Sequence, residues 1–316
     1  MPKKQEEQQE EGSDRRRRYE PGVPKRSMTP LKLRILSYIA ECGILSTGQV
    51  ARIAQMKEEA VTKHLRHLFD LRMVDTIAVP YANLAPPEEN GPNLAFGPGQ
   101  NIYIPTRAAI QFLERARRIS DEAAARKLPD YGPRNALFLS HELLVRDVRI
   151  WLELCNHIQG GFVERWLDGP AAHLPPVRPD AWFVYRIKSV GSLVGFVEAD
   201  RGTERGDQWE KKAGEYAELL ESDVVAEATG GRKKARVLVI TLTARRRDRL
   251  AQELARSPIK ESAYVATVED LKQGGLEHPV WRYSGMVNLQ PLLATSVLSS
   301  GQEQDVNQAQ DVKAVD

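Results

Sequence analysis

Hydrophobic positions recur at helical spacing from residue 29 onward. This spacing predicts three helices, over residues 29–43, 46–56 and 57–74. The first has a threonine N-cap and a proline at its first position, and the second begins with a Ser–Gln capping box. The apolar positions that define the first and third helices are Leu31, Ile35, Ile39, Val61, Leu65, Leu68 and Leu71. The three lengths, with a tight turn between the last two helices, favour a helix-turn-helix.

The pattern changes after the third helix. Residues 74–81 and 100–106 predict two strands on either side of a proline- and glycine-rich loop at 82–100. An amphipathic helix with a threonine cap follows over 106–118. This order of elements predicts a winged helix-turn-helix domain over residues 29–124.

The third helix has a polar face opposite its apolar stripe. Thr62, Lys63, Arg66 and His67 lie on this face, and short or basic side chains of this kind suit a DNA groove. We therefore predict that these four residues bind double-stranded DNA. The alternative is a winged-helix module that binds protein, for which an apolar or acidic face would be expected.

A second domain is predicted over residues 136–290, after a proline- and glycine-containing linker at 125–135. Its elements follow the order helix, three strands, helix, strand, helix, strand, so the fold class is α/β (α+β). The helices are predicted over 136–158, from Asp207, and over 244–257, and the strands over 161–169, 180–188, 191–200, 235–243 and 263–268. The second and third strands form a hairpin because only a short turn separates them.

Three carboxylates are expected to meet at one end of this hairpin. Glu198 and Asp200 lie on the same face of their strand, because side chains alternate with a period of two. Asp180 begins the neighbouring strand and therefore lies beside the end of the next one. Carboxylates at this spacing repel one another unless a cation compensates, and their oxygen atoms suit Mg²⁺ or Mn²⁺. The three residues are the predicted metal ligands.

Basic side chains could compensate the same carboxylates without a metal. Lys212 falls at the margin of the apolar face of the helix after the hairpin, so its ammonium can reach the cluster. Arg201 continues from the strand and is expected to bind a phosphate of DNA. A structural ion-pair network involving Arg201, Lys212 or Arg178 remains an alternative to a metal site. The arginine run at 245–247 opens a helix, where positive charge is unfavourable, and indicates either a phosphate-facing patch or a solvated face.

The second domain resembles the PD-(D/E)xK nuclease fold. Pro179-Asp180 and Glu198 match its motif, whereas Asp200 stands where the family has its lysine. The resemblance implies a restriction-endonuclease-like domain in which Asp180, Glu198, Asp200 and a migrated Lys212 are catalytic. In active members of that family, metal-assisted attack of water cleaves a phosphodiester.

A broader resemblance extends from about Thr29 to Val280. The segment Glu198-x-Asp200-Arg201-Gly202-Thr203, with Lys212 and Tyr216 after it, is similar to the replication-relaxation family of plasmid and mobile-element proteins. This resemblance implies a role in plasmid replication and in relaxation of plasmid DNA, with double-stranded DNA and replication proteins as partners. Two hypotheses follow. One is a Mg²⁺- or Mn²⁺-dependent nickase, and the other is a non-catalytic initiator or transcriptional regulator without a cofactor.

The amino-acid composition restricts the class of protein and its location. The 316 residues are 41% hydrophobic and 28% charged, with a net charge of only +2, so affinity for nucleic acid has to come from local patches. Two cysteines exclude a disulfide framework and fit a reducing compartment. No apolar run approaches the roughly 20 residues that cross a bilayer, so a cytoplasmic protein is expected. Polar residues 1–28 and 299–316 are expected to be disordered, and the arginines at 15–18 are either a DNA-binding arm or a solvated charge run.

Overall fold

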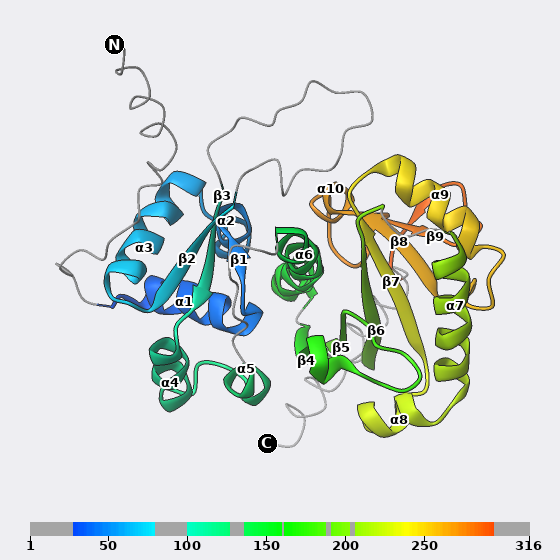
Figure 1. Ribbon diagram of the computed structural model, residues 1–316, viewed down its shortest axis with the longest axis horizontal. Coiled ribbons are helices and arrows are strands. Elements are labelled where there is room, and N and C mark those ends of the chain that lie inside the picture. The colour runs from blue at the N-terminus through cyan, green and yellow to red at the C-terminus, as the bar shows by residue number, and fades with distance from the viewer. Residues whose placement is uncertain are drawn as a thin grey trace, which may run out of the picture.

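The computed structural model describes residues 28–79, 100–126, 136–159, 161–187, 191–202 and 206–293. Within these ranges the protein has a mixed α/β structure with two separate sheets (Figure 1). Residues 1–27 and 299–316 of the terminal segments predicted to be disordered, residues 82–99 of the predicted loop and most of the predicted linker lie outside the described residues. No described helix is both long enough and apolar enough to cross a lipid bilayer.

The first part of the chain contains the three predicted helices and a small antiparallel sheet. Its elements are α1 (Pro30–Cys42), β1 (Leu45–Ser46), α2 (Thr47–Ala54), α3 (Glu58–Asp70), β2 (Val74–Val79), β3 (Gln100–Pro105), α4 (Arg107–Arg115) and α5 (Asp121–Ala125). The sheet order is β1-β3-β2. The capping box predicted from Ser46 and Gln49 is present at the start of α2. The two-residue strand β1 and the short helix α5 were not predicted.

The second part is built on a seven-stranded sheet of order β10-β9-β8-β7-β6-β5-β4. Its elements are α6 (Ala136–Gln159), β4 (Phe162–Asp168), β5 (Ala181–Ile187), β6 (Gly191–Asp200), α7 (Gly206–Glu221), α8 (Val224–Thr229), β7 (Ala235–Thr241), α9 (Ala244–Leu254), β8 (Ala263–Thr267), α10 (Val268–Leu271), β9 (Trp281–Tyr283) and β10 (Leu289–Gln290). Strands β5 and β6 form the predicted antiparallel hairpin, and β6, β7 and β8 are parallel. The last two strands, β9 and the edge strand β10, were not predicted.

Helices cover both faces of the large sheet. Helix α6 packs on one face, whereas α7 and α9 pack on the other (Figure 1). The alternation of β6 divides its side chains between two cores, with Val197 on the α6 side and Phe196 on the α7 side. Gly195 allows the ring of Phe183 to lie close to the strand, because a Cβ at this position would come within 2.4 Å of that ring.

Helix α6 belongs to both parts of the structure. Ile150 is buried in the core of the first part, while Trp151, the next residue, is buried against the large sheet. Leu143 packs with Ile44 and Ile102 at the small sheet. This helix therefore connects the two sheets through its side chains, and its position in Figure 1 lies between them.

A buried ionic network accompanies this packing. The carboxylate of Asp168, at the end of β4, accepts hydrogen bonds from Arg146 of α6 at 2.7 Å and from Arg126 at 3.3 Å. The indole of Trp166 also donates to it, at 3.1 Å. Burial raises the pKa of Asp168, but the two arginines outweigh burial and hold this pKa below its ordinary value. The network therefore links Arg126, which follows α5, and Arg146 of α6 to the end of β4 in the large sheet.

Replacing Asp168 with alanine should destabilise the protein strongly. The substitution leaves the Arg126 and Arg146 guanidiniums buried without their carboxylate, a change that typically costs about 3–5 kcal/mol. Urea unfolding followed by circular dichroism measures the loss. The matched control is Asp223→Ala, because Asp223 and its partner Lys233 are each 79% exposed and such pairs contribute only about 0–1 kcal/mol. Equal unfolding midpoints for the two variants would contradict the assigned role of Asp168.

Candidate functional site

The β5–β6 hairpin positions the predicted carboxylates at one end of the large sheet. Ala181 is paired with Val197, so Asp180 lies next to Glu198 across the hairpin. The backbone N–H of Asp180 donates to the carbonyl of Val197 at 3.1 Å, and the Asp180 side chain accepts from the N–H of Ala199 at 2.8 Å. These bonds fix the start of one strand against the end of the other, as the hairpin prediction requires.

Glu198 is held by two side chains of α7. The Tyr216 hydroxyl donates to Glu198 Oε1 at 2.6 Å, and Lys212 Nζ donates to Oε2 at 2.8 Å. Lys212 and Tyr216 are one helical turn apart, so both reach the same carboxylate. Lys212 thus lies where the helical phase placed it.

The protonation of Glu198 is strongly perturbed. Its side chain is only 1% exposed. Burial, followed by the nearby negative charge of Asp180, raises the pKa of Glu198 to about 8. Lys212 and Tyr216 act in the opposite direction but only partly offset these two effects. The Glu198 carboxyl therefore changes its charge near neutral pH.

Asp200 has a different set of partners on the same sheet face. Arg246, in the first turn of α9, binds it bidentately through Nε at 3.1 Å and Nη2 at 2.6 Å. The indole of Trp209 donates at 2.7 Å, and the backbone N–H of Gly202 donates as well. The contact between Arg246 and Asp200 was not predicted, because the arginine run at 245–247 indicated only a phosphate-facing patch or a solvated face.

His141 brings α6 to the same cluster. Its Nε2 lies 3.0 Å from Asp180 Oδ2. Burial lowers the pKa of His141, but the hydrogen bond and the charge of Asp180 outweigh it and raise this pKa overall. The pKa of Asp180 is lowered, because His141 and the Ala199 N–H outweigh the effect of burial. His141 was not predicted, since no sequence pattern indicates which residue of a distant helix contacts a hairpin.

The carboxylates are therefore separated into individual ion pairs. Asp180, Glu198 and Asp200 pair with His141, Lys212 and Arg246, respectively. Across the residues that the structure describes, no three His, Cys, Asp or Glu side chains are grouped to hold a metal. This differs from the expected three-carboxylate site, and the physical reason is that Arg246, Trp209 and Gly202 occupy both oxygens of Asp200.

Arg201 and Arg178 do not pair with these carboxylates in the described part of the chain. Arg201 is half-buried, its Nε is shielded from solvent without a hydrogen-bond partner, and burial lowers its pKa. Arg178 is exposed. Of the three cations expected to compensate the cluster, Lys212 is the one that the fold brings to it.

The predicted DNA-binding face of α3 is only partly open. Thr62 and Lys63 are exposed. Arg66 forms an ion pair with Asp70 at 3.1 Å along the same helix. His67 is half-buried, and its Nε2 is shielded from solvent. Lys63 therefore presents the most accessible charge of the four predicted residues.

Removing the ammonium beside Glu198 should raise the pKa of this carboxyl further. In Lys212→Met, burial and Asp180 act without the opposing charge, so carbon-13 NMR should show Glu198 titrating above its wild-type pKa of about 8. The control is Lys211→Met, because Lys211 is 81% exposed and pairs with Glu215 instead. A lower pKa in Lys212→Met, or the same shift in both variants, would contradict the assigned electrostatics.

The titration of Glu198 also makes the free energy of unfolding depend on pH. The folded-state pKa of Glu198 lies above the unfolded value. Its contribution to the free energy of unfolding is therefore fully present below about pH 4.5 and is lost as the pH rises through about 8. Glu198→Gln should abolish this loss, so its unfolding free energy should fall less between these pH values than that of the wild type. Urea unfolding at several pH values measures the difference, and parallel profiles would exclude the raised pKa.

Comparison with known proteins identifies the family of this chain. A family model described as Replication-relaxation matches residues 36–234, from within α1 to the residue before β7. Neither a curated protein nor a solved structure matches. The matched region covers more than half of the 316 residues and includes α3 and the Asp180–Glu198–Lys212 cluster. The protein belongs to the replication-relaxation family.

Proposed function

We propose that this protein binds duplex DNA during replication, and that residues 29–124 form a winged helix whose α3 enters the major groove. The observation that carries the proposal is the α2–turn–α3 unit, followed by the antiparallel strands β2 and β3, with Lys63 exposed on α3. In helix-turn-helix proteins the second helix reads the groove. The family's association with replication supports DNA as the ligand.

The charges of α3 fit this role. Lys63 supplies an exposed ammonium, and Thr62 next to it is small enough for close approach to a groove. The ion pair of Arg66 with Asp70 is half-buried, and i,i+4 pairs along a helix contribute only about 0.3–0.5 kcal/mol. Arg66 can therefore exchange Asp70 for a DNA phosphate at little cost. Because the net charge of the whole chain is only +2, this local patch carries the attraction.

Substituting Lys63 and Arg66 with alanine should weaken binding to duplex DNA. Each lost phosphate contact reduces the slope of log affinity against log salt by about 0.9, so the double variant should lose up to about 1.8 in slope. Gel-shift titrations at several salt concentrations measure both quantities. Lys233→Ala is the control, because Lys233 is 79% exposed and lies outside residues 29–124. Unchanged affinity and slope in the double variant would remove α3 from the interface.

A second candidate function, metal-dependent nicking of DNA, is favoured by the Asp180–Glu198–Lys212 cluster. We propose that α6, β4, β5, β6, α7 and β7 correspond to the α-β-β-β-α-β order of the restriction-endonuclease-like fold. Mg²⁺ is commonly held by one or two carboxylates, so Asp180 and Glu198 would suffice without Asp200. The ion would supply Lewis-acid activation of the scissile phosphodiester. Lys212 would place a positive charge beside it, and Arg201 would bind a phosphate.

The ion pairs support the non-catalytic alternative. Lys212 and Tyr216 already occupy both oxygens of Glu198, and His141 occupies one oxygen of Asp180. A metal ligand role for Glu198 therefore requires displacement of a protein partner. In the alternative, the cluster only fixes the hairpin against its helices, and the protein acts as an initiator or regulator that binds DNA without cleaving it.

Supercoiled plasmid incubated with the protein and Mn²⁺ distinguishes the two functions. The nickase function predicts open circles with the wild type and none with Asp180→Ala, Glu198→Ala. The control variant is Glu210→Ala, which removes an exposed carboxylate of α7 and should nick like the wild type. Calorimetry with Mn²⁺ should show binding that disappears in the double variant. No nicking by any protein, or equal nicking by all three, would exclude the nickase function and leave the binding function to the gel-shift result.

A further inference from the structure

Three neighbouring strands of the large sheet have an arginine where they meet one edge. Arg178 precedes β5 by three residues, Arg201 follows β6 directly, and Arg245 follows β7 in the first turn of α9. Strand β5 is antiparallel to β6, and β6 is parallel to β7, so the three positions lie at the same edge of the sheet. Lys272, which follows β8 and α10, continues this row. We call these four residues the basic edge.

The chain itself holds the arginines close to the carboxylate cluster. Arg178 lies two residues before Asp180, so their Cα atoms are at most about 7 Å apart. Arg201 directly follows Asp200, and Arg245 is followed by the arginine that binds Asp200. Arg178 and Arg245 are exposed. Arg201 is half-buried, and its Nε has no hydrogen-bond partner among the described residues. These side chains therefore surround the cluster rather than belong to it.

Nearby carboxylates do not cancel the charge of the basic edge. The three carboxylates of the cluster already have cationic partners of their own. Among the described side chains beside this edge, Glu210 of α7 and Glu269 of α10 are exposed. Glu269 pairs with Lys272 at 2.8 Å in an exposed contact. The four cations therefore outnumber the exposed carboxylates, and the edge attracts a polyanion.

A hollow of about 1060 Å³ separates the basic edge from the turn between α2 and α3. Its lining includes Met56, Lys57 and Glu58 at the start of α3, and Leu242, Val268 and Lys272 at the ends of β7 and β8. Arg52 and Asp147, which pair with each other, line it as well. In Figure 1, α10 lies at the end of the large sheet nearer to α2, and α8 lies at the opposite end. The basic edge thus faces the helix-turn-helix unit across this hollow.

We propose that the basic edge is a second contact surface for duplex DNA, and that a duplex bound by α3 reaches it across the hollow. The inference rests on the proposed binding of duplex DNA but not on nicking. Neighbouring strands lie about 4.8 Å apart, so the ends of β5, β6 and β7 span about 10 Å. One strand of a duplex carries a phosphate every ~3.4 Å along the axis, so this span faces about three consecutive phosphates. A guanidinium at each strand end can bind a phosphate bidentately.

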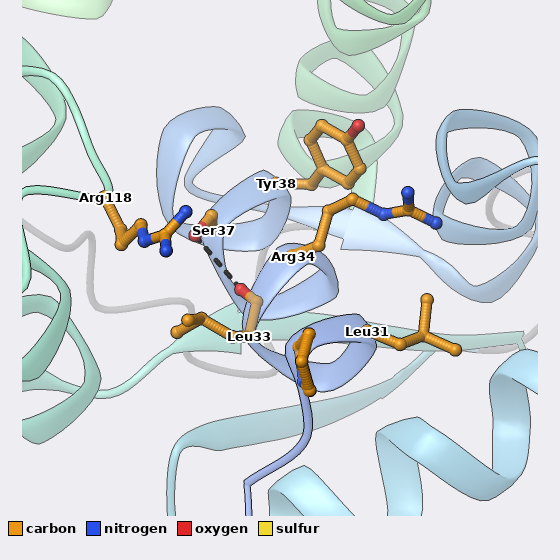
Figure 2. A pocket seen from close by; sticks show the side chains of 7 residues that line it. Leu31, Leu33, Arg34, Ser37, Tyr38 and Arg118 are labelled. Atoms are coloured by element: carbon orange, nitrogen blue, oxygen red, sulfur yellow. Dashed lines mark hydrogen bonds between the residues drawn. The ribbon is translucent and has the colours of Figure 1, made fainter.

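Two other exposed arginines do not form such a row and supply a matched control. Arg34 and Arg118 border a hollow of about 460 Å³ along α1. Figure 2 shows Arg118 and Leu33 on one side of this helix and Arg34 and Leu31 on the other. The helix and these apolar side chains separate the two guanidiniums. Substituting Arg34 and Arg118 therefore removes the same charge without touching the basic edge.

Arg178→Ala, Arg245→Ala in the full chain should weaken duplex binding in gel-shift titrations. Each lost phosphate contact reduces the slope of log affinity against log salt by about 0.9, so the slope should fall by up to about 1.8. Arg34→Ala, Arg118→Ala should leave affinity and slope unchanged. Because all four residues are exposed, thermal melting by circular dichroism should be the same for both variants and the wild type.

Photo-crosslinking tests direct contact at the same edge. Arg245→Cys, labelled with an azidophenacyl group, should crosslink to duplex DNA on irradiation, whereas Arg34→Cys with the same label should not. The native Cys42 and Cys155 are both buried, so the label reacts at the introduced position.

The outcomes separate this inference from the proposed role of α3. An unchanged slope in the edge variant, with a reduced slope in Lys63→Ala, Arg66→Ala, would overturn the inference and leave the α3 assignment intact. A reduced slope in the edge variant alone would keep the basic edge and overturn a duplex shared with α3. No duplex binding by the wild type would overturn both. Equal loss in the edge and control variants, or an effect on single-stranded DNA only, would overturn duplex contact at the basic edge.

Discussion

The arrangement of this protein depends on the buried charges of α6. Arg146, Asp147 and Arg149 are consecutive or nearly consecutive, and each is less than one tenth exposed. Charges removed from water in this way are tolerated only with close partners. The partners lie on both sides of the helix, with Asp168 on the large sheet and Glu41 on α1. Apolar contacts alone would allow α6 to shift along the surfaces on which it packs. The ion pairs fix one position of α6 against both the large sheet and α1.

The same helix links this junction to the carboxylate cluster. His141 lies one to two turns before the buried arginines and pairs with Asp180. The Asp180–His141 pair therefore depends on the register of α6 against the sheet, and so does the field that acts on Glu198. A displacement of α6 would change the distance from His141 to Asp180 and with it the pKa of both. The cluster is in this sense an extension of the domain junction.

Local rules predicted the part of the site that is local in sequence. Strand alternation, the hairpin and the phase of α7 were enough to bring Asp180, Glu198 and Lys212 together. The contacts of Arg246 and His141 could not be predicted from these local rules. The position of Arg246 follows from the parallel pairing of β6 with β7, and that of His141 follows from the packing of α6. The helix α6 was predicted, but its buried charges were not, since a helical pattern does not specify the partners of charged side chains. In the same way, the helices of the first part were predicted and the ion pair of Arg66 was not.

Stability alone does not account for the carboxylate cluster. A buried ion pair loses hydration of both groups, and well-packed apolar residues of similar volume are often as stabilising or more so. Here three pairs lie at one end of the β5–β6 hairpin, and the carboxylates of two of them, Glu198 and Asp200, are almost fully buried. Together they join helices from both faces of the sheet, since His141 comes from α6, Lys212 from α7 and Arg246 from α9. Charges that are costly to bury and that converge from three helices on one strand end therefore fix the geometry of that end.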